Sequence, residues 1–111
     1  MTYDRELAER LREQLAQVKN VTEKGMFGGL TFLINGNMAV SASRRGGLMV
    51  RVGPERNQEA LSRPYAQQIE MRGRPMTGWI WVAQEGIRTK RQLQSWVRRG
   101  VEFTRSLPPK G

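Results

Sequence analysis

The chain has 111 residues, a length that favours a single domain. It contains no cysteine and no histidine, which excludes disulfides, thiolate metal sites and a histidine general base, so we expect no enzymatic activity, no metal and no cofactor. Most of the net charge of +9 lies after residue 55, which is typical of a protein that binds nucleic acid or an acidic protein, or of one with a merely basic surface.

The opening residues are charged and lack the apolar region of a signal peptide. The longest apolar-leaning stretch, Leu30–Ile34, is far shorter than a membrane span. We therefore expect one soluble, cytoplasmic domain over residues 1–111, without a membrane partner.

Apolar residues at helical spacing predict a first helix over residues 4–18, with Asp4 at its N-cap. Residues 19–24 interrupt this pattern and are expected to form a loop or a short extended stretch. Three antiparallel strands are then expected, over residues 30–34, 38–43 and 48–52.

Asn35-Gly36 predicts a hairpin between the first two strands, because a type I′ turn needs positive φ at both central residues. In the second strand, alternation places Met38 on the same face as Val40.

Pro54 favours the start of a short helix that ends near Leu61. Two further strands are expected at residues 68–71 and 79–83. Thr89 and Gln92 fit a capping box for a last helix that runs to about Arg105. The order α-β-β-β-α-β-β-α has no regular βαβ alternation, so we predict an α+β fold, a two-layer sandwich on a mainly antiparallel sheet.

Glycines gather at Gly25, Gly28 and Gly29, before a predicted strand. Phosphate-binding loops instead precede a helix, and the Walker type ends in Gly-Lys-Ser/Thr, which is missing here. We therefore interpret this cluster as a bulge or tight turn that only glycine can occupy. Gly28 and Gly29 are therefore predicted to be architectural.

Trp79 and Trp81 share one face of their strand, and Ile80 and Val82 share the other. Either pair could face the core. Tryptophans on an open sheet face would mark a partner site, whereas the alternative is that they are core or rim residues. We expect a symmetric homodimer with Trp79 or Trp81 near the contact.

Arg91, Arg98 and Arg105 recur at seven-residue spacing, opposite the apolar face of the last helix. This set, here called the basic ridge, could contact nucleic-acid phosphates or an acidic partner. A solvated helix face is the more common meaning of such a stripe. We favour that meaning or an acidic partner over nucleic acid, because the ridge has no aromatic residue to stack on a base and no helix-turn-helix precedes it.

The chain resembles the TfoX N-terminal domain family. The segments that carry the resemblance are Met26–Leu30, Asn35–Met38, Leu48–Gly53, Arg74–Trp79 and Leu107–Lys110. It implies a bacterial α+β domain likened to secretion-chaperone folds, related to the TfoX/Sxy regulators of natural competence. Those regulators are thought to act as coactivators with the cyclic-AMP receptor protein and carry a second domain, which this chain is expected to lack.

No catalytic or ligand-binding residue carries over from the resemblance, because the shared motif residues look structural. They are Met26, Phe27, Gly28, Gly29, Pro75 and Gly78. The sequence therefore predicts a non-enzymatic regulatory or protein-interaction module, a candidate transcription co-regulator whose partner would be a transcription regulator protein. The alternative is a basic nucleic-acid-binding accessory protein that uses the last helix.

Overall fold

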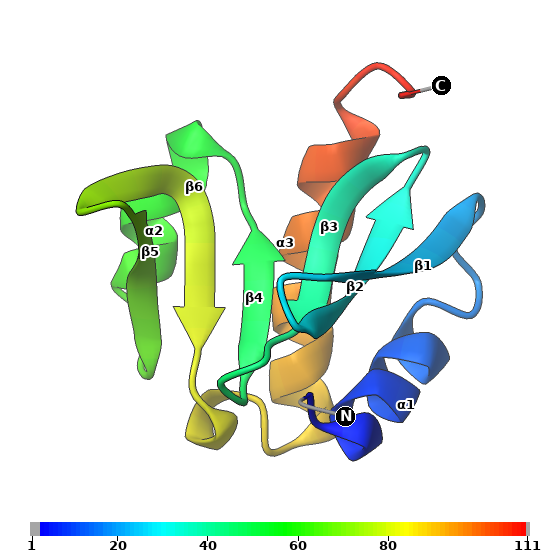
Figure 1. Cartoon of the computed structure of the whole chain (residues 1–111), viewed down its shortest axis with the longest axis horizontal. Helices are drawn as coiled ribbons and strands as arrows, with labels where there is room; N and C mark the ends of the chain where they lie inside the picture. Colours follow the sequence, from blue (N-terminus) through cyan, green and yellow to red (C-terminus); the bar gives the residue numbers. More distant parts are fainter. Residues whose placement is uncertain (1–2, 111) are drawn as a thin grey trace.

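A computed structural model describes residues 3–110, in which one sheet carries helices on one side. The helices are α1 (Arg5–Gln14), α2 (Asn57–Leu61) and α3 (Lys90–Arg105). In Figure 1, α2 and α3 lie behind the strands, and α1 lies below β1 and β2. Short 3-10 helices occupy Pro54–Arg56 and Gln84–Gly86. The strands are β1 (Val21–Met26), β2 (Gly29–Ile34), β3 (Asn37–Ala42), β4 (Leu48–Arg51), β5 (Ala66–Met71) and β6 (Arg74–Val82).

The strand order is β1-β2-β3-β4-β6-β5, and all neighbouring pairs are antiparallel. The predicted α+β class is confirmed, with one strand more than the sequence analysis expected. That strand is β1, which forms where a loop or short extended stretch was predicted. It is an edge strand with mostly exposed side chains, so its sequence shows no apolar alternation by which a strand is recognised.

Hairpin turns of two residues with positive φ join the outer strands. The expected turn at Asn35-Gly36 is confirmed, with φ of 53° and 80°. Phe27-Gly28 forms an equivalent turn between β1 and β2, and Arg72-Gly73 joins β5 to β6. The predicted start of the last helix is also confirmed, because Thr89 and Gln92 form both hydrogen bonds of the capping box.

The core lies between the sheet and the helices. Val50 on β4 pairs with Val40 on one side and with Ile80 on the other, and all three are buried. Helix α3 packs on this layer through Leu93, Trp96 and Val97. Burial of these side chains is the main term that stabilises a domain of this size.

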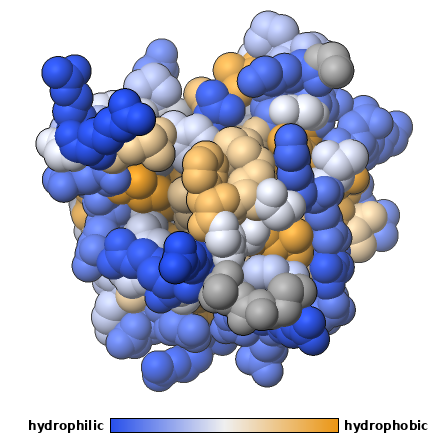
Figure 2. Space-filling model, viewed as in Figure 1, coloured by the Kyte–Doolittle hydropathy of each residue, from blue (hydrophilic) through white to orange (hydrophobic). Residues whose placement is uncertain are grey.

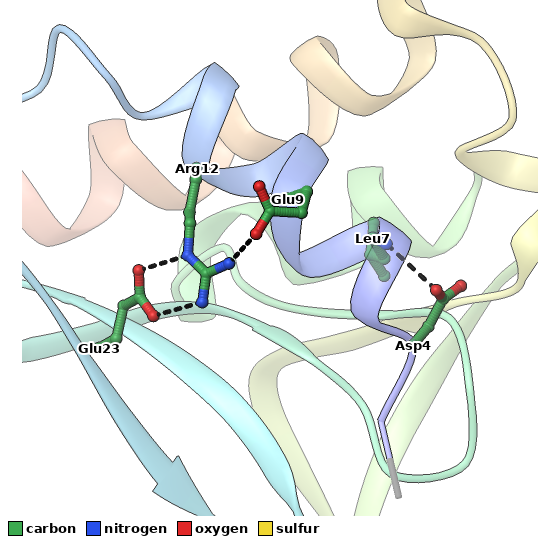
Figure 3. A network of polar contacts seen from close by, with 5 residues as sticks. All are labelled: Asp4, Leu7, Glu9, Arg12 and Glu23. Atoms are coloured by element: carbon green, nitrogen blue, oxygen red, sulfur yellow. Dashed lines mark hydrogen bonds and ion pairs between the residues drawn. The ribbon is translucent and has the colours of Figure 1, made fainter. Parts of the chain in front are cut away.

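Helix α1 begins as predicted, with the Leu7 backbone N–H donating to the Asp4 carboxylate at 3.2 Å (Figure 3). It ends at Gln14 rather than at Val18. Leu15 nevertheless remains buried and Val18 packs against the core, because a turn carries them along the sheet. The helical spacing of apolar residues therefore extended past the helix itself.

A bulge in β3 changes one sequence-based expectation. Phe32 pairs with Val40 but Leu33 pairs with Met38, so Ala39 is an extra residue on β3. An extra residue reverses the alternation of a strand, and Met38 therefore points away from the face that Val40 occupies. The prediction that Met38 and Val40 share a face is wrong for this reason.

Arg12 joins α1 to β1 by an ion pair to Glu23, and it also pairs with Glu9 within α1 (Figure 3). Its Nε and Nη2 atoms donate to the two Glu23 carboxylate oxygens at 2.7 and 2.8 Å. This bidentate hydrogen bonding holds the pKa of the Glu23 carboxyl below its usual value.

The Arg12–Glu23 contact predicts a pH-dependent contribution to stability. Because the folded-state pKa of Glu23 is lowered, the contribution is present above the unfolded pKa of about 4.3 and is lost as the pH falls through the folded value. Glu23→Gln should be less stable than wild type at pH 7, and the difference should disappear in acid. Denaturant unfolding across pH 2.5–7 measures this, with Glu13→Gln on the exposed side of α1 as the control. An equal difference at all pH values would contradict it.

Gly29 is predicted to be required by close packing. A Cβ at Gly29 would lie 2.5 Å from the Ala42 carbonyl oxygen on β3, and backbone cannot move aside cheaply. Gly29→Ala should therefore lower the free energy of unfolding by about 1 kcal/mol or more. Gly25→Ala is the matched control, because a Cβ there meets no heavy atom within 4 Å. Equal denaturation midpoints for the two variants would refute the close-packing argument.

Candidate functional site

Trp79 and Trp81 lie on the sheet face opposite the helices. Their neighbours Ile80 and Val82 have 0% of their surface exposed and face the helices, whereas both tryptophans are half-buried. This decides which pair faces the core, a choice that strand alternation left open. The tryptophans belong to a sheet face that the helices do not cover (Figure 1).

A groove of about 550 Å³ crosses this open face. Figure 2, which looks at the same face, shows apolar surface gathered near its middle with hydrophilic residues around it. We call this feature the methionine groove. Its apolar lining residues are Met26, Phe27, Met38, Met49, Ile69, Met71, Met76 and Trp79.

All methionines of the described chain converge on the groove. The sequence contains 6, and each one except Met1, which lies outside residues 3–110, lines it. Met38 and Met49 come from the inner strands β3 and β4, between the β1–β2 hairpin and the β5–β6 hairpin. Flexible thioether side chains suit a surface that adapts its shape to a bound partner.

Sequence analysis singled out only a few of these residues. Met26, Phe27 and Gly29 were noted as motif residues and Trp79 as an interface candidate, but the remaining methionines were missed. Strand alternation was the available signal. Met49 lies on the opposite face of its strand from Leu48 and Val50, just as Trp79 lies on the opposite face from Ile80. The bulge that turns Met38 into the groove had no such signal.

Two arginines of the β3–β4 loop are the charged residues of the groove lining, and no carboxylate lines it. The Arg45 guanidinium stacks 3.8 Å from the centroid of the Trp81 ring, and the Trp81 indole N–H donates to the Gly46 carbonyl at 2.7 Å. Neither Arg44 nor Arg45 forms a salt bridge within residues 3–110. The groove is therefore apolar with a positively charged end.

Arg51 adds a third positive charge beside Trp79. Its guanidinium lies 5.0 Å from the Trp79 ring and 5.3 Å from the Phe103 ring, in the range of cation–π contacts. Burial between these rings lowers the pKa of Arg51, and in the part of the chain that is described no carboxylate forms an ion pair with it. Aromatic faces thus partly replace water around this cation.

Phe27 stands at the rim of the groove in an unusual conformation. Its φ of 53° places it in the left-handed region, which is uncommon for a residue other than glycine, asparagine or aspartate. Its side chain is nevertheless 71% exposed. The two-residue turn between β1 and β2 requires this conformation, and the turn presents the apolar ring at the groove.

Gly78 and Asn57 join the middle of β6 to α2. The Gly78 N–H donates to the Asn57 side-chain oxygen at 2.7 Å, and the Gly78 carbonyl accepts from the Val52 N–H at 2.7 Å. Gly78 has a φ of 97°, and a Cβ there would lie 2.9 Å from the Gly53 carbonyl carbon. These contacts agree with an architectural role for Gly78. The other motif residue of this strand, Pro75, lies exposed on β6 and pairs with Glu70.

The basic ridge lies on the other side of the molecule from the groove. Helix α3 packs on the covered sheet face, and Arg91, Arg98 and Arg105 are exposed on it. In residues 3–110 none of the three forms a salt bridge or side-chain hydrogen bond. By contrast, Arg99 is bound by Glu59 of α2, whose carboxyl pKa is lowered by that hydrogen bond.

Within residues 3–110, no three or more acidic side chains come together in a group that could hold a metal ion. No helix in the same range combines the length and apolar character needed to cross a bilayer. The methionine groove and the basic ridge are thus the two candidate binding surfaces of the described chain.

A family model described as the TfoX N-terminal domain matches residues 13–104. The chain belongs to the TfoX N-terminal domain family. The matched range of this TfoX domain begins in α1 and ends in α3, so it includes every residue of the groove but only Arg91 and Arg98 of the ridge. Membership supports a competence-regulator-like module. No curated protein and no solved structure matches the chain.

Asn57 is predicted to hold the TfoX domain's β6 in place through its buried amide. Besides accepting from Gly78, it donates to the Gln68 side-chain oxygen at 2.8 Å. Asn57→Ala should lower the free energy of unfolding by about 1–3 kcal/mol, because a buried N–H loses its acceptor. Chemical denaturation measures the loss, and Gln58→Ala at the exposed neighbouring position should be nearly neutral. Equal stabilities would show that Asn57 is dispensable.

Proposed function

We propose that this chain is a non-enzymatic protein-interaction module that regulates transcription by binding a transcription regulator protein through the methionine groove. The observation that carries the proposal is the convergence of the described methionines on an uncovered apolar face. Contiguous exposed apolar surface on a small domain is typical of a partner site. Membership of the TfoX N-terminal domain family supports the regulatory class.

The chemistry of the groove favours binding over catalysis. Its polar lining consists of serine hydroxyls and two guanidinium groups. The Ser41 hydroxyl is already engaged, since it donates to the Leu30 carbonyl at 3.0 Å. A nucleophile needs an adjacent general base, and the groove lining contains neither a carboxylate nor a lysine.

The basic ridge supports a second candidate function, binding of nucleic acid along α3. Its three exposed guanidinium groups have no acidic partner in the described chain and are free to contact phosphates. It presents no aromatic side chain for base stacking, so such binding would be independent of sequence. We place it second for that reason.

Transcript profiles of the native host separate the two functions. A chromosomal variant with Phe27→Ala and Met76→Ala should reproduce the profile of a deletion strain, because both side chains line the groove. A variant with Arg91→Ala, Arg98→Ala and Arg105→Ala should match the wild type. RNA sequencing measures both, with immunoblots to establish equal protein levels.

The opposite pattern would assign the function to the ridge. In that case purified protein should shift DNA in gels at about 50 mM salt, and the triple ridge variant should lose the shift. A deletion strain with an unchanged profile would refute the regulatory proposal.

A further inference from the structure

We propose that the methionine groove binds an acidic amphipathic helix of another protein. The inference rests on the proposed function and adds the form and the charge of the partner segment. It is carried by three features of the open face: the paired backbone beneath the groove, the long flexible apolar side chains of its lining, and the positive charge at its end.

The hydrogen bonding of the sheet favours a helix over an extended strand. Met38, Met49 and Trp79 lie on β3, β4 and β6, and each of these strands is paired on both sides. Their backbone groups are therefore unavailable to a strand laid across the groove. A helix satisfies its own backbone groups and can bury one apolar face without leaving amides unpaired.

The apolar lining suits helix side chains at i, i+3, i+4 and i+7. Thioether side chains adjust their torsions to fit leucine, methionine or phenylalanine anchors of different shapes. Phe27, with 71% of its surface exposed at the tip of the β1–β2 hairpin, provides a rigid aromatic contact beside them. Aromatic side chains are enriched in protein interfaces, and a helix that covers this ring would remove its apolar surface from water.

Charge complementarity favours acidic residues on the polar side of that helix. Arg44 and Arg45 line the groove, and no carboxylate within the described chain forms an ion pair with either. Arg45 is held over the Trp81 ring, so its guanidinium is positioned before a partner arrives. Arginine with unoccupied donors pairs bidentately with Glu or Asp carboxylates.

A second copy of the chain is the other occupant to weigh, since the sequence analysis expects a homodimer at this face. Each copy carries a net charge of +9, and the groove contributes only arginines to its charged lining. Self-association through the groove would bring like charges together without a compensating carboxylate from the lining. We therefore assign the groove to an acidic partner.

Fluorescence anisotropy with designed helical probes of about 15 residues tests the inference. The acidic probe carries leucines at i, i+4, i+7 and i+11, about four glutamates on the opposite side and alanine or glutamine elsewhere, so that like charges do not unfold it. A second probe has lysines in place of the glutamates, and a third has alanines in place of the leucines. At about 100 mM salt only the acidic leucine probe should bind full-length protein with micromolar affinity, because both apolar burial and charge are required.

Matched variants locate the binding surface. Phe27→Ala should weaken binding by about fivefold or more. Tyr65→Ala is its control, because Tyr65 is also aromatic, 54% exposed and at positive φ, but does not line the groove. Arg44→Gln with Arg45→Gln should weaken binding by about fivefold or more, whereas Arg91→Gln with Arg98→Gln should change it by less than about twofold. Circular dichroism melting establishes that each variant folds.

Four results would overturn the inference. If the lysine probe binds as tightly as the acidic probe, the partner need not be acidic. If the alanine probe binds equally, or if no probe binds, the partner is not an amphipathic helix. Sedimentation at tens of micromolar that gives a dimer, converted to a monomer by Phe27→Ala, would assign the groove to a second copy. In each case the transcript profile of the groove variant still tests the proposed function separately.

Discussion

The six-stranded sheet carries its helices on one face only, and this asymmetry constrains the rest of the structure. Strand alternation sends half of the side chains toward the helices and half toward the other face. Ile80 and Val82 fill the covered side of β6, on which α2 packs. Their neighbours Trp79 and Trp81 must then occupy a face that no helix protects.

The open face is adapted to this exposure in a specific way. Arg45 stacks on Trp81, and Arg51 lies between Trp79 and Phe103, so guanidinium groups cover part of the aromatic surface. Such contacts shield the rings while keeping charge at the surface. What remains uncovered is the methionine groove, whose side chains are apolar but conformationally adaptable. The same arrangement that keeps the open face hydrated also provides the proposed binding surface.

The arginines that join secondary-structure elements differ in their partners from the arginines of the open face. On the helix side, Arg12 and Arg99 are bound by glutamates and join secondary-structure elements: α1 to β1 and α3 to α2. On the open face, Arg44, Arg45 and Arg51 make no ion pair in the described chain and contact aromatic rings or line the groove. The positive charge of the chain is thus partly neutralised where it supports the fold and left available where a partner is proposed.

Local chemistry by itself determined much of the architecture. Asn35-Gly36 specifies its hairpin and Thr89 with Gln92 specifies the start of α3, because turns and caps depend on residues close together in sequence. The apolar spacing predicted a helix to residue 18, whereas α1 ends at Gln14, because the spacing does not show where helical hydrogen bonding stops. Strand β1 was missed because its exposed edge position leaves no apolar pattern.

Only the tertiary structure decided which face of each strand lies inside. Alternation is symmetric, so the sequence could not choose between the tryptophans and Ile80 with Val82. The packing of the helices on one face of the sheet, with α2 on β6, made that choice. The bulge at Ala39 then turned Met38 toward the open face, against the simple alternation. The methionine groove was therefore not visible in the sequence: its residues come from all six strands, the β1–β2 turn and the β3–β4 loop, and only strand pairing brings them together.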